Sequence, residues 1–136
     1  MLINARTARI HWGVCDPAGI VFFPLYCSIF DDSTAMLFER ALGMTKFELM
    51  QRQKFSGFPL VDIRARFLIP SRFGDDVVVE SGVSEFRRSS FDVQHRLLKS
   101  DRLAVECLET RVWTCQDADG RTKGVPIPEE IRAKFA

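Results

Sequence analysis

One acidic side chain stands in a setting suited to catalysis. Asp16 lies in the segment Trp12–Tyr26, which reads WGVCDPAGIVFFPLY, and is followed by Pro17, Ala18 and Gly19. Proline fixes its own φ angle and glycine permits φ values that other residues resist, so the segment predicts a tight turn. A helix beginning just beyond would offer unpaired backbone N–H groups and a partial positive charge near the carboxylate. Such an arrangement can attack a carbonyl carbon and hold the resulting oxyanion.

Two other interpretations of this segment stay open. Asp16 could merely close an Asx-turn before the helix, with no catalytic role. The adjacent Cys15 would need a histidine base to act as a nucleophile, and the chain holds only His11 and His95, neither in a recognisable Cys/His motif. His95 falls on an apolar strand face, which favours a satisfied core residue over a ligand, and His11 is most simply structural.

The elements that must position Asp16 follow from hydrophobic periodicity. Residues 4–13 alternate loosely and predict a strand. From about Leu25, apolar residues recur at spacings of three and four until Gly43 supplies a C-terminal stop, which predicts one long helix. Thr45 and Glu48 have the spacing of a capping box and open a short second helix.

After Gly57 the pattern becomes that of β-structure. Turn-forming residues separate four strand-like segments, and Pro126 and Pro128 introduce a short terminal helix. One strand, one long helix and four consecutive strands predict a single α+β domain over residues 1–136, with an antiparallel sheet covering the helix. The four later strands are expected at Leu60–Ile69, Val77–Phe86, Ser89–Lys99 and Leu103–Cys115.

Composition restricts the class of function. Apolar residues make up 46% of the chain and charged residues 27%, which is typical of a globular protein. The net charge of +1 gives no general attraction to nucleic acid or membranes, and no apolar run approaches the ~18 residues that span a bilayer. Four cysteines form no CxxC pair and no metal-ligand spacing occurs, so we expect a reduced, cytoplasmic protein without a metal ion.

Three motifs carry a resemblance to a known family. CDPAGIV followed by FPLY (15–26), FSGFPLV (55–61) and EFRRSSF (85–91) resemble the 4-hydroxybenzoyl-CoA thioesterase family of hot-dog-fold proteins. The resemblance implies a hot-dog fold, in which an antiparallel five-stranded sheet is wrapped around a long central helix. It also implies hydrolysis of a small-molecule acyl-CoA to free acid and coenzyme A, with no further cofactor. Such proteins assemble as homo-oligomers, here expected to be a dimer of dimers with active sites between subunits.

The resemblance also implies roles for individual residues. Asp16 would act as nucleophile or general base, and the backbone N–H of Phe23 would polarise the carbonyl. Phenylalanine replaces a tyrosine of the family at that position, so an aromatic-hydroxyl specificity is not carried over. Arg87 and Arg88 match an arginine pair that binds coenzyme A phosphates through charge-assisted hydrogen bonds, and Ser89 stands where the family has a lysine.

Three further residues match the substrate pocket of the family. Asp31 corresponds to an acid that helps shape the pocket, and Gly57 and Pro59 align with a loop near the acyl group. Without the resemblance, Asp31 would be an ordinary charge on a helix surface and the other two a turn entering a strand. The pair Arg87–Arg88 would likewise be a solvated turn tip.

Two alternatives to an acyl-CoA thioesterase follow from the same residues. A thioesterase acting on acyl carrier protein would also use a basic surface at Arg87–Arg88, and salt sensitivity would separate the two. A non-catalytic hot-dog module would bind acyl-CoA without turning it over. A nucleic-acid partner is not expected, because the chain has no basic stripe. The twelve phenylalanines suggest an acyl group of apolar or aromatic character.

Overall fold

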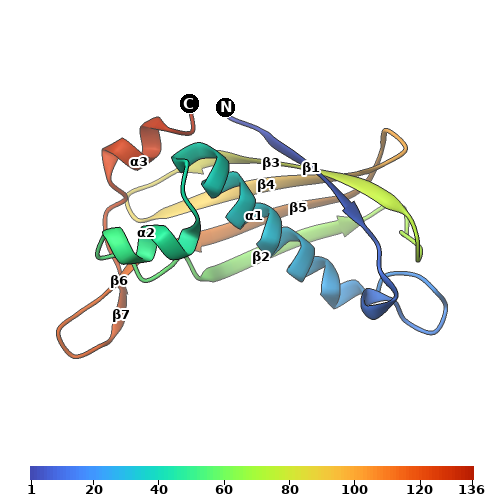
Figure 1. Cartoon of the computed structure of the whole chain (residues 1–136), viewed down its shortest axis with the longest axis horizontal. Coiled ribbons are helices and arrows are strands. Elements are labelled where there is room, and N and C mark those ends of the chain that lie inside the picture. Colours follow the sequence, from blue (N-terminus) through green and yellow to red (C-terminus); the bar gives the residue numbers. More distant parts are fainter.

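The computed structural model describes residues 1–136 and contains one sheet that packs against a long helix (Figure 1). In chain order the elements are β1 (Asn4–Arg9), α1 (Tyr26–Leu42), α2 (Lys46–Arg52), β2 (Leu60–Phe67), β3 (Asp76–Phe86), β4 (Ser90–Lys99), β5 (Arg102–Val112), β6 (Thr114–Gln116), β7 (Thr122–Gly124) and α3 (Glu129–Ala133). The sheet is antiparallel in the order β1–β3–β4–β5–β2. The predicted α+β architecture, a five-stranded sheet with a long central helix, is confirmed.

Helix α1 has the bounds that its periodicity predicts. It follows a 3₁₀ turn at Phe23–Leu25 and ends at Gly43, whose φ of +70° is favourable for glycine. The N–H of Gly43 donates to the carbonyl of Glu39 at 2.9 Å, which satisfies one carbonyl of the last turn. The predicted capping box of α2 also forms, with the Glu48 N–H donating to Thr45 Oγ1 at 3.1 Å.

The hydrophobic core has two parts, one at each end of α1. Near the start of the helix, Phe30 packs among small side chains of β3 and β5. Near its end, Phe38 packs against Phe58 and Phe135, with ring centroids 4.6 and 4.7 Å away. Burying a side chain of this size contributes about 2–3 kcal/mol, so the two groups fix both ends of α1 on the sheet.

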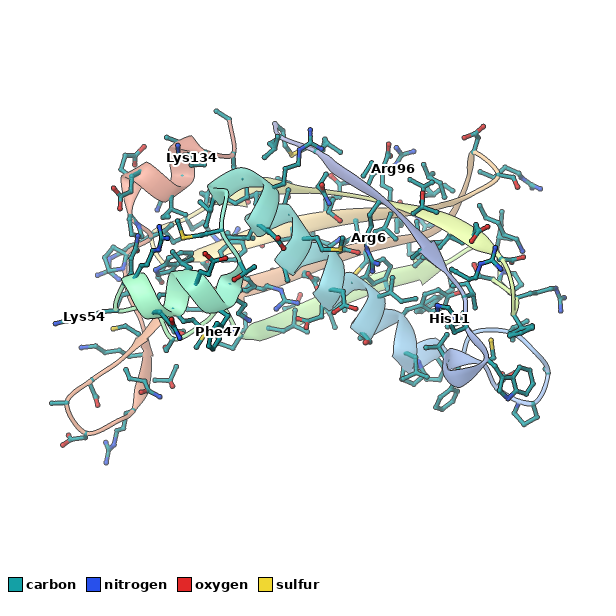
Figure 2. The ribbon with its side chains drawn as sticks, in the orientation of Figure 1. Arg6, His11, Phe47, Lys54, Arg96 and Lys134 are labelled. Atoms are coloured by element: carbon teal, nitrogen blue, oxygen red, sulfur yellow. The ribbon has the colours of Figure 1, made fainter.

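A side chain of β1, an edge strand of the sheet, forms hydrogen bonds with helix α1. Arg6 donates from Nε to Ser33 Oγ and from Nη2 to the carbonyl of Ile29, both at 2.9 Å. Figure 2 shows Arg6 lying between β1 and α1. No helix of the chain is long and apolar enough to cross a membrane.

Two strand boundaries differ from the prediction by three residues or more. β1 ends at Arg9 rather than near residue 13, because Ile10 pairs with the turn before β3 and the chain then bends into a 3₁₀ turn at Trp12–Val14. β5 ends at Val112, and residues 114–124 form the separate hairpin β6–β7. Asp117 accounts for that hairpin, because its Oδ1 accepts hydrogen bonds from two backbone N–H groups of the turn at 2.9 Å.

Candidate active site

Asp16 occupies a turn that its own side chain helps to close. Its Oδ1 accepts a hydrogen bond from the Ala18 N–H at 2.8 Å, and its carbonyl accepts one from the Gly19 N–H at 2.9 Å. Gly19 has a φ of +80°, which a residue with a Cβ adopts only with strain. The Asx-turn considered above is therefore present, but it uses one carboxylate oxygen. Oδ2 accepts no hydrogen bond from the chain, and the half-buried residue can offer it to a substrate.

The segment between β2 and β3 anchors this turn. The Val21 N–H donates to the carbonyl of Ser71 at 3.0 Å, and the Phe73 N–H donates to the carbonyl of Gly19 at 2.9 Å. Backbone pairing on both sides restricts the φ and ψ angles of the loop. Asp16 is therefore carried by a fixed backbone unit.

The amide of Phe23 stands at the start of the helical segment that becomes α1. The neighbouring amides of Phe22 and Leu25 both donate to carbonyl oxygens at 2.8 Å, whereas the Phe23 N–H has no carbonyl partner. An unpaired N–H at a helix start carries part of the positive end of the helix dipole. This donor and Asp16 lie on the two arms of the same loop.

Exposed aromatic rings surround the Phe23 position. The ring of Phe23 meets those of Phe22 and Phe67 edge-on, at centroid distances of 5.8 and 6.4 Å. Phe67 also contacts the buried ring of Tyr26 at 5.4 Å. Because Phe67 is the last residue of β2, the aromatic surface runs from the Asp16 loop to an edge of the sheet.

The residues predicted to form the acyl pocket come together around a side chain that the sequence did not single out. Arg111 donates from Nη2 to Asp31 Oδ1 at 2.9 Å and from Nη1 to the carbonyl of Phe58 at 3.2 Å. Phe58 lies between Gly57 and Pro59. Asp31 on α1 and the turn before β2 are thus joined through β5.

Arg111 belongs to a buried polar network between α1 and the sheet. Glu109, 1% exposed, accepts Arg111 Nε at Oε1 (3.2 Å) and Arg111 Nη2 at Oε2 (2.8 Å). His95 Nε2 and Thr34 Oγ1 bind the same Oε1 at 2.9 and 2.6 Å. Burial acts to raise the pKa of Glu109, but the hydrogen bonds from His95, Arg111 and Thr34 lower it to about 2. His95 Nδ1 lies 2.7 Å from Ser81 Oγ, so His95 is the satisfied core residue that the sequence predicts.

The alternation of β5 holds the signal that could have revealed this network. Glu109 and Arg111 fall on the same face of the strand as Val105 and Cys107, and all four are buried. Two charged residues on an otherwise apolar face must be paired with each other or with buried polar groups.

The residues predicted to bind coenzyme A occupy the turn between β3 and β4. Arg87 forms ion pairs with Asp92 at 2.6 Å and with Glu85 at 3.0 Å. Arg88 is exposed and its side chain makes no hydrogen bond, while Ser89 is half-buried. The guanidinium of Arg88 is therefore the more available of the two for a phosphate.

Asp16 and Arg88 lie at opposite ends of the molecule. The segment that anchors the Asp16 loop leads into β3, whose eleven residues end just before Arg87. An extended strand of that length spans roughly 35 Å. Figure 1 shows the loop before α1 at one end of the sheet and the β3–β4 turn at the other, near α3. Figure 2 places His11 at the first end, and Lys54 and Lys134 at the second.

Comparison with known proteins identifies the family of this arrangement. The family model of the thioesterase-like superfamily matches residues 10–135. The chain belongs to the thioesterase-like superfamily. It is accordingly a thioester hydrolase, the enzyme class expected from the sequence.

Individual thioesterases resemble the chain over nearly its whole length. The 4-hydroxybenzoyl-CoA thioesterase of Pseudomonas sp. (strain CBS-3) is 28% identical over 128 residues, which cover 90% of this chain and 89% of that relative. The acyl-CoA thioesterase YbgC of Haemophilus influenzae is 24% identical and covers 93% and 90%. The solved structure of a gentisyl-coenzyme A thioesterase superposes with a TM-score of 0.84 at 30% identity, covering 98% of this chain and all of that one. The hot-dog fold is thereby confirmed.

Of the four cysteines of this thioesterase, the one in the Asp16 loop has only a backbone partner. All four are free thiols, and the Cys15 thiol lies 3.5 Å from the backbone carbonyl of His11 rather than beside an imidazole. The chain contains no group of three His, Cys, Asp or Glu side chains arranged to hold a metal ion. Asp16 is therefore the candidate attacking group that the loop presents.

Proposed function

We propose that this thioesterase hydrolyses an acyl-CoA thioester to a carboxylic acid and coenzyme A, with the Asp16 carboxylate acting at the carbonyl carbon. The observation that carries the proposal is that the unbound Oδ2 of Asp16 and the unpaired N–H of Phe23 share one anchored loop at the start of α1. Coenzyme A as the thiol is supported by the names of the relatives, 4-hydroxybenzoyl-CoA thioesterase and acyl-CoA thioesterase.

The loop suits two chemical routes. In both, the Phe23 N–H donates to the thioester oxygen and stabilises the negative charge of the tetrahedral intermediate. In one route, Asp16 attacks the carbonyl carbon, the C–S bond breaks to release the coenzyme A thiolate, and water then hydrolyses the mixed anhydride. In the other, Asp16 takes a proton from a water molecule that attacks directly. Rapid quenching followed by mass spectrometry of the protein distinguishes them, because only the first leaves the acyl group on the chain.

An aromatic acyl group fits the surface around the loop. Phe22, Phe23 and Phe67 present exposed rings beside the Asp16 turn, and aromatic pairs of this kind favour edge-on or offset contacts with a further ring. Two relatives are named for hydroxylated benzoyl thioesters. A solved neighbour of the same fold, an Asp-to-Asn variant of 4-hydroxybenzoyl-CoA thioesterase, is complexed with 4-hydroxybenzoyl-CoA.

A second copy of the chain is needed to complete the site. β2 is an edge strand that pairs only with β5 and exposes Leu60, Val61 and Phe67, so a partner strand would satisfy both its backbone and its apolar side chains. A twofold axis that pairs β2 with its copy sets the two strands antiparallel. The Phe67 end, beside the Asp16 loop, then meets the Leu60 end of the second copy, which follows the turn at Pro59. A homodimer is thus part of the proposal, and the family resemblance extends it to a dimer of dimers.

The deciding experiment measures thiol release from benzoyl-, 4-hydroxybenzoyl-, acetyl- and octanoyl-CoA. We expect rapid hydrolysis of an aromatic ester and a loss of about 10³-fold or more in kcat for Asp16→Asn, with substrate binding retained. Asp32→Asn is the matched control, since Asp32 is an exposed acid of α1 without a hydrogen-bond partner. An unaffected Asp16→Asn protein, or thiol release from none of the esters, contradicts the proposal.

Cytoplasmic location is proposed on separate grounds. All four cysteines are free thiols, a state typical of proteins kept in a reducing compartment. Fractionation of cells that express the tagged chain tests the location directly.

A further inference from the structure

We infer that Arg111 is a positioning residue for the acyl end of the site: it holds the Asp31 carboxylate and the Phe58 carbonyl in one fixed relation. The inference rests on the proposed function and on the pocket role that the family resemblance implies for Asp31 and for the turn at residues 57–59, which contains Phe58. Arg111 itself is 3% exposed and touches the pocket only through these two groups.

The orientation of the Arg111 side chain is set by Glu109, its neighbour on β5. Its Nε and Nη2 donate to the two oxygens of Glu109, so the planar guanidinium and the carboxylate are matched as a fork. Glu109 is in turn held by Thr34 and His95, which both bond to its Oε1. Each partner restricts the rotation of the next, which leaves Arg111 one conformation in which all its bonds form.

The same guanidinium group also forms hydrogen bonds with two separate segments of the chain. Nη1 donates to the carbonyl of Phe58 before β2, and Nη2 donates to Asp31 Oδ1 on α1. No other hydrogen bond joins α1 to this turn. The Asp31 side chain is 63% exposed, and its Oδ2 accepts no hydrogen bond from the chain. Arg111 therefore presents an oriented carboxylate oxygen at the surface, where a polar group of the substrate can meet it.

Stability alone gives a poor account of this arrangement. A buried ion pair loses hydration that its attraction barely repays, and apolar side chains of similar volume often stabilise a fold as well or better. The bond from Arg111 to a largely exposed carboxylate adds little to stability, because water competes for both partners. A charged network of this kind can orient the Asp31 carboxylate, whereas an apolar core could not.

The experiment compares benzoyl-CoA with 4-hydroxybenzoyl-CoA, which differ by one ring hydroxyl. The measured quantity is the ratio of kcat/KM for 4-hydroxybenzoyl-CoA to kcat/KM for benzoyl-CoA. We expect Asp31→Asn and Arg111→Met each to reduce this ratio about tenfold, chiefly through a higher KM for the hydroxylated ester. The reason is that a carboxylate without a fixed orientation distinguishes poorly between the two rings. The Asp31→Asn/Arg111→Met double variant should lose no more than either single one, because both changes remove the same oriented oxygen. Arg111→Lys should recover part of the ratio by keeping one donor.

Arg6→Met is the matched control, because it removes an arginine that also bonds to α1, at Ser33 and Ile29, but has no contact with Glu109 or Asp31. It should lower Tm and leave the ratio unchanged. The inference is overturned if folded Arg111→Met or Arg111→Lys keeps the wild-type ratio, or if the double variant shows additive losses. Should neither Arg111 variant fold, Asp31→Asn decides, since this surface change must alter the ratio.

Failure of the inference can be told from failure of the proposed function. If the wild type releases thiol, Asp16→Asn does not, and the Arg111 variants retain the ratio, only the positioning role is overturned. If the wild type releases thiol from no ester, the proposed function fails and the inference falls with it.

Discussion

Arg87 and Asp92 face each other across the β3–β4 hairpin, with Arg87 Nη2 only 2.6 Å from Asp92 Oδ1. The hydrogen bond from Arg87 lowers the pKa of Asp92, as expected for a carboxylate held in its charged form. Arg88, the next residue, has no such partner. The two adjacent arginines are therefore expected to have different roles, Arg87 in stability and Arg88 in binding, although the sequence does not distinguish them.

Replacing these arginines should separate binding from stability. Arg88→Ala should raise KM for an acyl-CoA about five- to tenfold, because a charge-assisted bond to phosphate is lost, and should leave Tm unchanged. Arg87→Ala should lower the free energy of unfolding by about 1 kcal/mol through loss of its ion pairs. Steady-state kinetics on the coenzyme A ester and on the matching N-acetylcysteamine ester provide the check. An equal rise in KM on both esters would mean that Arg88 does not contact the nucleotide.

Mixing two variants that are each impaired at low substrate should restore activity if the site is shared between copies. Asp16 and Arg88 lie at opposite ends of one chain, so an active site that uses both must draw them from different chains. Asp16→Asn and Arg88→Glu, refolded together, should recover about a quarter of wild-type activity at low substrate, since half of the dimers are mixed and each has one intact site. Each variant refolded alone is the control. No recovery in a mixture shown to exchange subunits argues for a site within one chain.

Acid should destabilise the protein through Glu109. Its pKa lies at about 2 in the folded chain, below the ordinary value of 4.5, so the fold favours the charged form. The stability contributed by this group is complete above about pH 5 and is lost as the pH falls toward 2, a difference of about 3 kcal/mol. Glu109→Gln should reduce this dependence and lower stability at pH 7. Urea unfolding between pH 2 and 7 measures both effects.

A surface carboxylate provides the comparison for Glu109. Glu106 lies on the same strand and pairs with Arg66 at 3.0 Å near solvent. Glu106→Gln should change the free energy of unfolding by less than about 1 kcal/mol at pH 7 and retain the steep acid dependence. If the two variants lose the same stability with the same pH profile, the buried network is not the source of the acid sensitivity.

Strain at Gly19 should affect catalysis, whereas equal strain elsewhere should not. Gly19 has a φ of +80° and Gly120, in the β6–β7 hairpin, a φ of +77°, and neither position has a neighbour that a Cβ would meet. Alanine should therefore cost about 1 kcal/mol at either site. Gly19→Ala should also lower kcat about tenfold, because relaxation of the turn moves Asp16. Gly120→Ala should have the same Tm as Gly19→Ala and keep the wild-type kcat. Equal kcat values for the two variants would show that the geometry of the Asp16 turn is not critical for catalysis.

Features that depend on nearby residues could be predicted from the sequence. The bounds of α1, the capping box of α2 and the positions of β2 to β5 follow from periodicity, caps and turns, all of which act over a few residues. The hairpin β6–β7 was missed because its short strands hold no periodic signal. The motif around Asp16 likewise indicated a turn before a helix, and its resemblance to a family indicated the fold.

Pairings between distant residues were decided only by the tertiary structure. Arg111 and Asp31 are 80 positions apart, and their 2.9 Å contact depends on the register of β5 and on the rotation of α1 over the sheet. The ion pair between Arg87 and Asp92, and the distance between Asp16 and Arg88, likewise depend on how the strands and the helix are arranged in the folded chain. Local patterns set where each element begins and ends, because their hydrogen bonds form between close neighbours. Which side chains meet across elements is set by packing of the whole core, since a shift of one residue in register turns every side chain of a strand to the other face.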